Sequence, residues 1–362
     1  MKIIVNNINY DLRPEGAFVL ANDYRGDITI PAQISVDGQS IRVIGIAQEA
    51  FYGCDNVTSI ALPEGLTTIE DSAFEFMNSL TEIVISDSVT HIGRSAFSTC
   101  ENLQRVVLPS QLTTIPEDLF ESCGSLTEVN IPAGVKTLEP GCFSACTSLK
   151  TIQLPEGLVT IGNRAFDYCT NLRYVDMPDT VNNLGHSAFA GCTNLRYVKL
   201  SENVRLMRND LFYECTQLQT VLLGSQIKNV GSGTFAKCET LRTIYLPETV
   251  KKIGEGAFSG CRSLKEIRIP NSVHILDMSA FDGCYEMNSL ILGPNISHVK
   301  GINEVLSDWK ATIFVPRHKI DTYCQKGLEP LREHIQALET MEAESLETLL
   351  DWFIDYQLSK GE

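Results

Sequence analysis

The fold is decided by a stretch in the middle of the chain, Ile161-Gly162-Asn163-Arg164-Ala165-Phe166-Asp167-Tyr168-Cys169-Thr170-Asn171-Leu172-Arg173-Tyr174-Val175-Asp176-Met177-Pro178. Its phenylalanine recurs every 23 residues without insertion or deletion, at Phe51, Phe74, Phe97, Phe120, Phe143, Phe166, Phe189, Phe212, Phe235, Phe258 and Phe281. Eleven copies in phase indicate one structural unit stacked eleven times. Because each unit of such a stack contacts only its neighbours, we expect one elongated domain.

Each copy predicts two short extended segments. In the quoted copy Val175 and Met177 alternate with polar residues, the period-two pattern of a strand. Pro178 follows, and because proline cannot donate to a ladder, the strand should end before it. A second, shorter extended segment ends at Ile161, and Gly162 predicts a turn after it. One unit cannot bury its apolar side alone, so parallel stacking should form continuous apolar ladders.

This pattern, Ile-Gly-x-x-Ala-Phe-x-x-Cys-x-x-Leu-x-x-Val-x-Leu-Pro, resembles the repeat of BspA-like leucine-rich-repeat proteins over about residues 26 to 316. The resemblance implies a leucine-rich-repeat solenoid, a curved stack with a parallel β-sheet on its concave face and short extended and turn segments opposite. The family includes bacterial surface adhesins that bind host matrix proteins and other cells. It therefore implies a non-enzymatic interaction protein at the cell surface or secreted, but its stacking residues specify no ligand.

The repeat phase also locates the ends of the stack. One period beyond Phe281 stands Glu304, yet Ile313 and Val315 keep the strand phase, which predicts a degenerate twelfth repeat. Alternating apolar residues before Ile28 suggest a hairpin that covers the first open edge. We expect an N-terminal capping hairpin and first degenerate repeat at 1–50, eleven 23-residue repeats at 51–303, a degenerate twelfth repeat and cap at 304–330, and an acidic helical C-terminal segment at 331–362.

The C-terminal segment has two interpretations. From Glu342 to Leu358 apolar residues recur at helical spacing, with acidic residues between them. Nine acidic residues against Arg332 and Lys360 give residues 329–362 a net charge of −7 of the total −16. The segment is either a helical cap on the last repeat or an amphipathic helix that docks a partner.

Composition argues against several classes of function. A net charge of −16 disfavours nucleic acids and anionic membranes, and no apolar stretch is long enough to span a bilayer. Ten of the twelve cysteines occupy one repeat position, which favours buried free thiols over disulfides. The histidines are scattered and no hydrolase, kinase or dinucleotide-binding motif occurs, so we expect no metal, no cofactor and no catalytic residue. The N-terminus lacks an export signal, which indicates a cytoplasmic protein if this is the native start.

The binding surface should lie where the repeat leaves residues free. With the inward positions of each first strand fixed as apolar, the positions eight and ten residues after phenylalanine must face outward. Near the middle these carry tyrosines and mixed charge, the composition that contact hot spots favour. We expect the ligand-binding residues to be Tyr174, Tyr197, Asp176, Lys199, Leu222, Tyr245 and Arg268. The preceding column adds Lys150, Arg173, Arg196, Arg242 and Lys265, whose direction the sequence leaves open.

The residues leave three functions open. The first is a monomeric, adhesin-type module whose strand face binds a protein partner, such as a host matrix or cell-surface protein. The second is an intracellular scaffold, favoured by the many cysteines and the missing export signal. The third is a carbohydrate-binding module that uses the exposed tyrosines.

Overall fold

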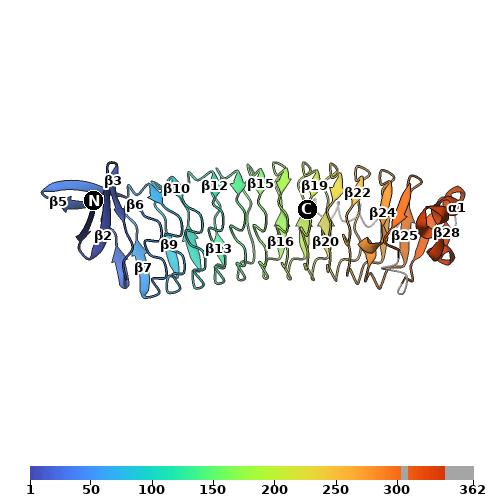
Figure 1. Ribbon diagram of the computed structural model, residues 1–362, viewed down its shortest axis with the longest axis horizontal. Coiled ribbons are helices and arrows are strands. Elements are labelled where there is room, and N and C mark those ends of the chain that lie inside the picture. The colour runs from blue at the N-terminus through green and yellow to red at the C-terminus, as the bar shows by residue number, and fades with distance from the viewer. Residues whose placement is uncertain (303–308, 339–362) are drawn as a thin grey trace, which may run out of the picture.

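Residues 1–302 and 309–338 are described by the computed structural model, in which the chain winds into an elongated stack of short strands (Figure 1). Each repeat forms one layer of this stack, called a rung below. The first strands of successive rungs are β4 (Gly26–Thr29), β7 (Val57–Ala61), β9 (Glu82–Val84), β11 (Arg105–Val107), β13 (Glu128–Val129), β16 (Tyr174–Asp176), β18 (Tyr197–Lys199), β20 (Thr220–Leu222), β23 (Glu266–Ile269), β25 (Ser289–Leu292) and β27 (Thr312–Val315). The second strands are β8 (Thr68–Ile69), β10 (His91–Ile92), β12 (Thr114–Ile115), β14 (Thr137–Leu138), β15 (Thr160–Ile161), β17 (Asn183–Leu184), β19 (Leu206–Met207), β21 (Asn229–Val230), β22 (Lys252–Ile253), β24 (Ile275–Asp277) and β26 (His298–Lys300).

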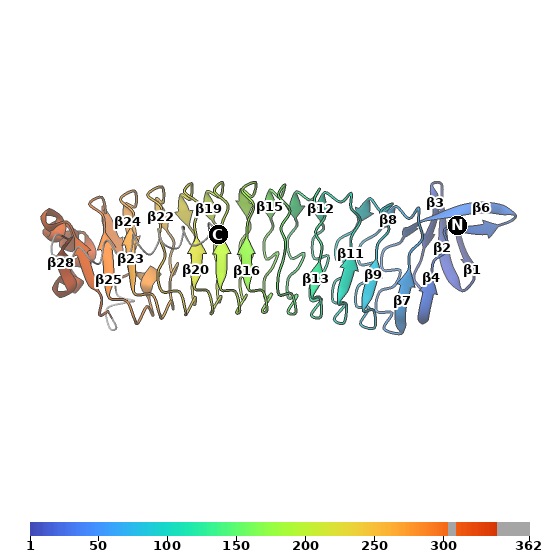
Figure 2. The same cartoon turned by 180° about the vertical axis from the view of Figure 1, so that it is seen from behind.

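Parallel pairing holds successive rungs in register. Val175 on β16 lies opposite Val198 on β18, and Ile161 on β15 lies opposite Leu184 on β17, so pairing partners are one repeat apart. The two sets of strands run along opposite long edges of the stack (Figures 1 and 2). This confirms the predicted leucine-rich-repeat solenoid, and it shows that the second extended segment builds a ladder of its own.

The first-strand ladder is divided into separate sheets. One contains β9, β11 and β13, the next β16, β18 and β20, and the last β23, β25 and β27 with one further strand. Between them, residues 151–153 and 243–245 form no strand, although Ile152 and Ile244 remain buried in the core. The apolar alternation therefore continues through rungs whose backbone pairing does not.

A ladder of phenylalanine rings fills the interior. Neighbouring rings from Phe51 to Phe281 are stacked with centroids 5.0 to 6.0 Å apart, and none is more than 2 % exposed. Phe166 lies 5.4 Å from Phe143 and 5.3 Å from Phe189. Such offset aromatic stacking adds to the free energy gained by burying the rings. The spacing that the sequence displays is therefore the spacing of the core.

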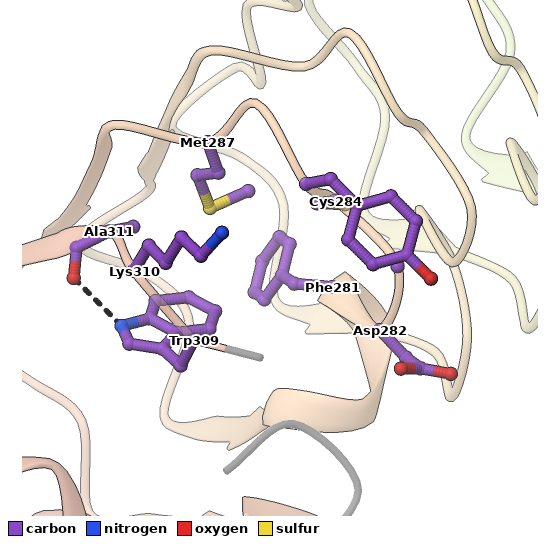
Figure 3. A pocket seen from close by; sticks show the side chains of 9 residues that line it. Phe281, Asp282, Cys284, Met287, Trp309, Lys310 and Ala311 are labelled. Atoms are coloured by element: carbon purple, nitrogen blue, oxygen red, sulfur yellow. Dashed lines mark hydrogen bonds between the residues drawn. The ribbon is translucent and has the colours of Figure 1, made fainter. Parts of the chain in front are cut away.

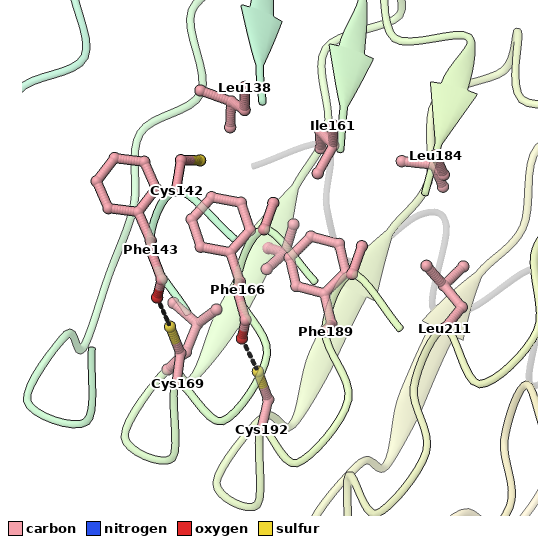
Figure 4. Packing of buried hydrophobic residues seen from close by; sticks show 14 of the residues in the cluster. Leu138, Cys142, Phe143, Ile161, Phe166, Cys169, Leu184, Phe189, Cys192 and Leu211 are labelled. Carbon is pink, nitrogen blue, oxygen red and sulfur yellow. Dashed lines mark hydrogen bonds between the residues drawn. The ribbon is translucent and has the colours of Figure 1, made fainter. Parts of the chain in front are cut away.

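The cysteines form a second ladder beside the rings. The thiol of Cys192 donates a hydrogen bond to the carbonyl oxygen of Phe166, with 3.1 Å between Sγ and oxygen (Figure 4). The same bond joins nine successive rungs, from Cys100 to Cys284. All twelve cysteines are free, and all but Cys284 are buried. Each thiol thus supplies a donor to a buried backbone acceptor of the neighbouring rung, which explains why this column is cysteine.

Residues with left-handed backbone flank every ladder phenylalanine from Phe51 to Phe258 on both sides. Around Phe166 these are Arg164, with φ 56°, and Tyr168, with φ 55°. Around Phe189 they are Ser187, with φ 54°, and Gly191, with φ 68°. For a residue other than glycine this conformation costs on the order of 1–3 kcal/mol, so it persists only because the stacked rungs impose it. The turns around the phenylalanines thus have a left-handed backbone that the sequence does not indicate.

The glycines that follow the second strands have a different role from the one the sequence suggests. Gly162 and Gly231 do not have the left-handed backbone that favours glycine in turns. A Cβ atom on Gly231 would lie 2.6 Å from the carbonyl carbon of Arg208 in the preceding rung, and one on Gly162 would lie 2.6 Å from the nitrogen of Pro140. These glycines permit close backbone approach between rungs rather than a turn.

The N-terminus covers the first rung with more strands than predicted. β1 (Lys2–Val5) and β2 (Ile8–Arg13) form the expected antiparallel hairpin, and β3 (Gly16–Val19) extends it. A second hairpin, β5 (Gln33–Val36) with β6 (Gln39–Ile46), accounts for the residues inserted before Phe51. β6 pairs in parallel with β3 and with β8, so it joins the cap to the second-strand ladder.

The C-terminal end combines helical turns with one more strand. A short 3-10 helix at Met278–Phe281 precedes β25, and β27 pairs in parallel with β25 at the position where the sequence predicts a twelfth strand. Residues 317–334 form a 3-10 turn, the helix α1 (Ile320–Tyr323), a π-helical turn and a second 3-10 turn. β28 (Ile335–Ala337) then pairs in parallel with β27. The helix predicted from residue 331 onward is therefore not formed by these three residues, because they pair with the free edge of the first-strand ladder. The predicted helix at 342–358 lies outside the described residues, as does Glu304, which stands one period beyond Phe281.

Candidate protein-binding face

Tyr174 and Tyr197 are neighbours on the outer side of β16 and β18. They lie directly opposite each other in the parallel register, as the repeat spacing predicts. Because side chains alternate along a strand, Val175 and Val198 point into the core and are fully buried. Tyr174 is 49 % exposed and Tyr197 is half-buried. The two rungs together present an aromatic surface to solvent.

An ion pair borders the tyrosines on the next outward positions. Asp176 lies opposite Lys199, whose Nζ atom is 3.2 Å from Oδ1 of Asp176. The hydrogen bond to Asp176 raises the pKa of Lys199 above its usual value. Leu222 lies opposite Lys199 on β20 and is half-buried. An exposed pair of this kind contributes little to stability, so its main effect is to orient the two side chains beside the rings.

Tyr245 lies on the rung that interrupts the sheet, and Arg268 lies on the next rung. Tyr245 is 56 % exposed, and its rung forms no strand, although Ile244 of the same rung remains buried in the core. Arg268 belongs to β23 in the following sheet and pairs with Glu248, with 3.3 Å between nitrogen and oxygen. The residues Tyr174, Tyr197, Asp176, Lys199 and Leu222 belong to one sheet, Arg268 belongs to the next sheet, and Tyr245 lies on the unpaired rung between the two sheets.

A row of cations runs beside the tyrosines. All of its members are exposed: Lys150, Arg173, Arg196, Arg242 and Lys265. The backbone of Arg173 donates to the carbonyl oxygen of Lys150 at 3.2 Å, and that of Arg196 to Arg173 at 2.8 Å, so these residues occupy adjacent rungs. Within the described part of the chain, none of the five forms an ion pair. This basic row, whose direction the sequence could not fix, faces solvent.

A comparable set of cations lies beside the second strands. Arg205, Lys228 and Lys251 are exposed and adjacent, because the backbone of Lys228 donates to Arg205 at 2.8 Å and that of Lys251 to Lys228 at 2.7 Å. The outward residues next to them are Leu206, Asn229 and Lys252, without an aromatic ring. What distinguishes the first-strand face is thus the combination of a basic row with a tyrosine pair.

A small slot lies at the C-terminal end of the phenylalanine ladder. The slot at the C-terminal end is lined by Phe281, Cys284, Met287 and Trp309, and Trp309 Nε1 donates to the carbonyl oxygen of Ala311 at 2.8 Å (Figure 3). Its volume of about 20 Å³ has room for about one water molecule. The slot lies beside Phe281, the last ring of the phenylalanine ladder.

Residues 1–302 and 309–338 hold neither a cluster of metal-ligand side chains nor a helix that could span a membrane. In that part of the chain no three histidine, cysteine or acidic side chains gather closely enough to hold a metal ion. Likewise, no helix there has the length and apolar character needed to cross a bilayer.

Solved structures with the same fold match over 81% to 93% of the chain. A leucine-rich repeat protein from Bacteroides ovatus ATCC 8483 matches with a TM-score of 0.64 and 24% identity over 93% of this chain and 98% of its own. A leucine rich cell surface protein from Faecalibacterium prausnitzii A2-165 matches with a TM-score of 0.53 and 26% identity over 81% and 94%. The pneumococcal vaccine antigen PcpA matches with a TM-score of 0.54 and 18% identity over 93% and 97%.

Sequence families give the same classification. The chain matches none of the curated proteins. The family model described as the BspA type leucine rich repeat region, in six copies, matches residues 33–150, 113–242 and 228–301. Solenoids of this class generally serve protein interaction through their extended surfaces. Since the match spans most of the chain and the repeat residues form its ladders, the chain belongs to the BspA type leucine rich repeat family.

Proposed function

We propose that the chain is a non-enzymatic, adhesin-type module that binds an acidic segment of a protein partner through the first-strand face between Lys150 and Arg268. The observation that carries this proposal is the exposed basic row beside Tyr174 and Tyr197. Tyrosine supplies a large contact area with a polar tip, and arginine is the cation most often found in contact hot spots. Together they favour a partner that brings both apolar and acidic side chains.

The basic row is costly for the free protein. Adjacent rungs stand roughly 4.8 Å apart, so like charges on neighbouring rungs repel each other, at a cost of a few tenths to about 1 kcal/mol for charges that lie directly opposite. Lys150, Arg173 and Arg196 occupy three such rungs, in a protein whose net charge is −16. Carboxylates of a partner would relieve this repulsion. Such a row lowers the stability of the free protein, so its presence supports a role in binding.

A similar structure supports the adhesin-type part of the proposal. The Faecalibacterium protein, 26% identical to this chain, is described as a leucine rich cell surface protein. The analogy concerns location at the cell surface, and a partner among host matrix or cell-surface proteins remains part of the proposal. The intracellular scaffold would use the same face, and the free thiols suit it, yet their burial also protects them from oxidation outside the cell.

Replacing Arg173 by glutamate is expected to separate binding from stability. Arg173→Glu places a carboxylate between Lys150 and Arg196, so the unfolding free energy should stay constant or rise by up to about 1 kcal/mol. The affinity for acidic peptides, selected on the wild-type protein from a random display library, should fall at least about tenfold. Equilibrium unfolding and peptide titration measure the two quantities on the same samples.

The matched control is Lys228→Glu, which makes the same charge change at the centre of the second-strand cations. It should weaken the peptides less than about threefold, through long-range electrostatics alone. Selected peptides without an excess of acidic residues, or equal affinity for Arg173→Glu and wild type, would contradict the proposal. A glycan panel run alongside tests the predicted carbohydrate alternative for this face.

A further inference from the structure

A second hollow lies on the turns around the phenylalanines, apart from the strand face. It is an open depression of about 370 Å³ that crosses three rungs and is lined by Arg164, Asp167, Tyr168, Ser187, Ala190, Asp210 and Tyr213. Tyr168 and Tyr213 belong to rungs two apart, and the phenylalanine rings between these rungs are spaced by 5.3 and 5.7 Å. The depression thus has an aromatic side chain on each of its outer rungs and small residues on the rung between.

Tyr168 is held as a flat platform by the absence of a side chain in the next rung. A Cβ atom on Gly191 would lie 2.7 Å from Cδ1 and 2.9 Å from Cε1 of Tyr168, so the ring rests directly on the Gly191 backbone. The ring nevertheless remains 50 % exposed. An aromatic ring that is fixed from below and open above offers its face to a ligand at little cost in conformational entropy.

Tyr213 is fixed by its own partners. Its hydroxyl accepts a hydrogen bond from Nζ of Lys237 at 2.7 Å, and the same ammonium group lies 4.9 Å from the centre of the ring. Lys237 also donates to Oε1 of Glu214 at 2.7 Å. Both tyrosines are therefore held in place before any ligand arrives.

Polar groups line the space between the rings. Nε of Arg164 donates to Oδ2 of Asp167 at 2.7 Å, and Asp167 is 4 % exposed. Burial raises the pKa of Asp167, against the lowering effect of Arg164. The Arg164 side chain remains 61 % exposed, and within the described part of the chain its Nη atoms make no hydrogen bond. Arg164 thus offers a pre-oriented planar donor, while Asp210 and Ser187 offer oxygen acceptors.

The backbone of the depression is already occupied. The amide groups of Arg164, Tyr168, Ser187, Gly191 and Asp210 each donate to a carbonyl oxygen of the following rung, at distances of 2.7 to 3.0 Å. A peptide strand added here would find these donors used, which removes the main attraction of strand addition. Recognition must come from aromatic faces and polar side chains, a combination that suits a ligand with C–H faces and many hydroxyl groups.

We propose that this depression is a carbohydrate-binding site that takes a short oligosaccharide, with one sugar ring packed on Tyr168 and its hydroxyl groups bonded to Arg164 and Asp210. Tyr213 bounds the far end and contacts a further ring. The site is independent of the proposed protein-binding face, because none of its residues belongs to the tyrosine pair or to the basic row.

The test is a glycan array of neutral and acidic hexose-containing oligosaccharides, followed by calorimetric titration of the best binder. Tyr168→Ala should reduce its affinity at least about tenfold. Gly191→Ala should do the same, because the new methyl group displaces the Tyr168 ring. The turn itself accepts alanine, since Ala145 occupies the equivalent left-handed position with φ 56°.

Two matched controls isolate the platform. Gly260→Ala makes the same substitution at an equivalent position, with φ 71°, where the new Cβ would meet only Lys237 at ordinary contact distance. Tyr52→Ala removes another tyrosine from the turns that is also 50 % exposed. Both should keep wild-type affinity. An array with no signal above that of Tyr168→Ala, or affinity unchanged in both Tyr168→Ala and Gly191→Ala, would overturn the proposal.

Discussion

Raising the pH above 9 is expected to unfold the protein cooperatively, well before pH 12 is reached. Burial raises the pKa of Cys100 from the model-compound value of 9.0 to about 12, and it raises the pKa of Cys192 and Cys238 well above 9.0. The thiols are neutral hydrogen-bond donors in the folded stack, but they ionise in the unfolded chain as soon as the pH passes 9. Stability is therefore complete below pH 9 and is lost as the pH rises toward the folded-state pKa.

The expected size of this effect is large because the thiols act together. A single group shifted from 9.0 to about 12 accounts for roughly 4 kcal/mol once the pH exceeds both values, at 1.36 kcal/mol per pH unit. The shifts of Cys192 and Cys238 have the same direction, so their contributions add to this loss, which is already large beside the 5–15 kcal/mol by which domains are usually stable. Circular dichroism and thiolate absorbance, followed through the same alkaline titration, should change together. Thiolate formation that begins near pH 9 while the dichroism stays native would contradict the burial of the cysteine ladder.

Truncating one ring of the phenylalanine ladder is expected to cost on the order of 3–5 kcal/mol. Phe166 is fully buried and stacks on Phe143 and Phe189, so Phe166→Ala removes both contacts and leaves a cavity between rungs that cannot collapse. Because a solenoid is stabilised by nearest-neighbour contacts, the loss also weakens the coupling between its two halves. Denaturant unfolding should show a lower midpoint and a less cooperative transition.

Tyr174→Ala is the matched control for Phe166→Ala. It removes an aromatic ring from the same repeat, but from the exposed outer side of β16. Its unfolding free energy should change by less than about 1 kcal/mol. A loss below about 1 kcal/mol for Phe166→Ala as well would show that the ring is not part of a buried ladder.

Periodic features of the fold were predictable because they repeat. Phe166, Cys169 and Val175 recur at one spacing, and a side chain that recurs in phase must meet its own copies in a stack. The same arithmetic placed Tyr174 beside Tyr197. The features that could not be predicted depend on the backbone conformation within a single rung, or on a contact with a single neighbouring segment. The gap in the sheet at 243–245 leaves the apolar pattern unchanged, and the strand at 335–337 lacks the repeat altogether.

The conformation of the turns around the phenylalanines is the main feature that the sequence did not predict. Arg164 and Tyr168 have left-handed backbone without being glycine, so composition gives no warning of the turn. The platform at Tyr168 depends on the missing side chain of Gly191 in the next rung, a relation between two residues that no single column displays. Comparing residues one repeat apart could have revealed this platform. The signal is a large side chain in one rung whose equivalent position in the next rung is glycine.

The most direct test of the proposed binding face is zero-length carbodiimide cross-linking of the selected acidic peptides, with the joined lysines identified by mass spectrometry. The reagent couples a carboxylate only to an amine that it contacts. Lys150 and Lys265 lie in the basic row, whereas Lys228 and Lys251 lie beside the second strands, and all four are exposed. We expect cross-links at Lys150 and Lys265. Cross-links confined to Lys228 and Lys251 would place the partner on the opposite edge and contradict the account.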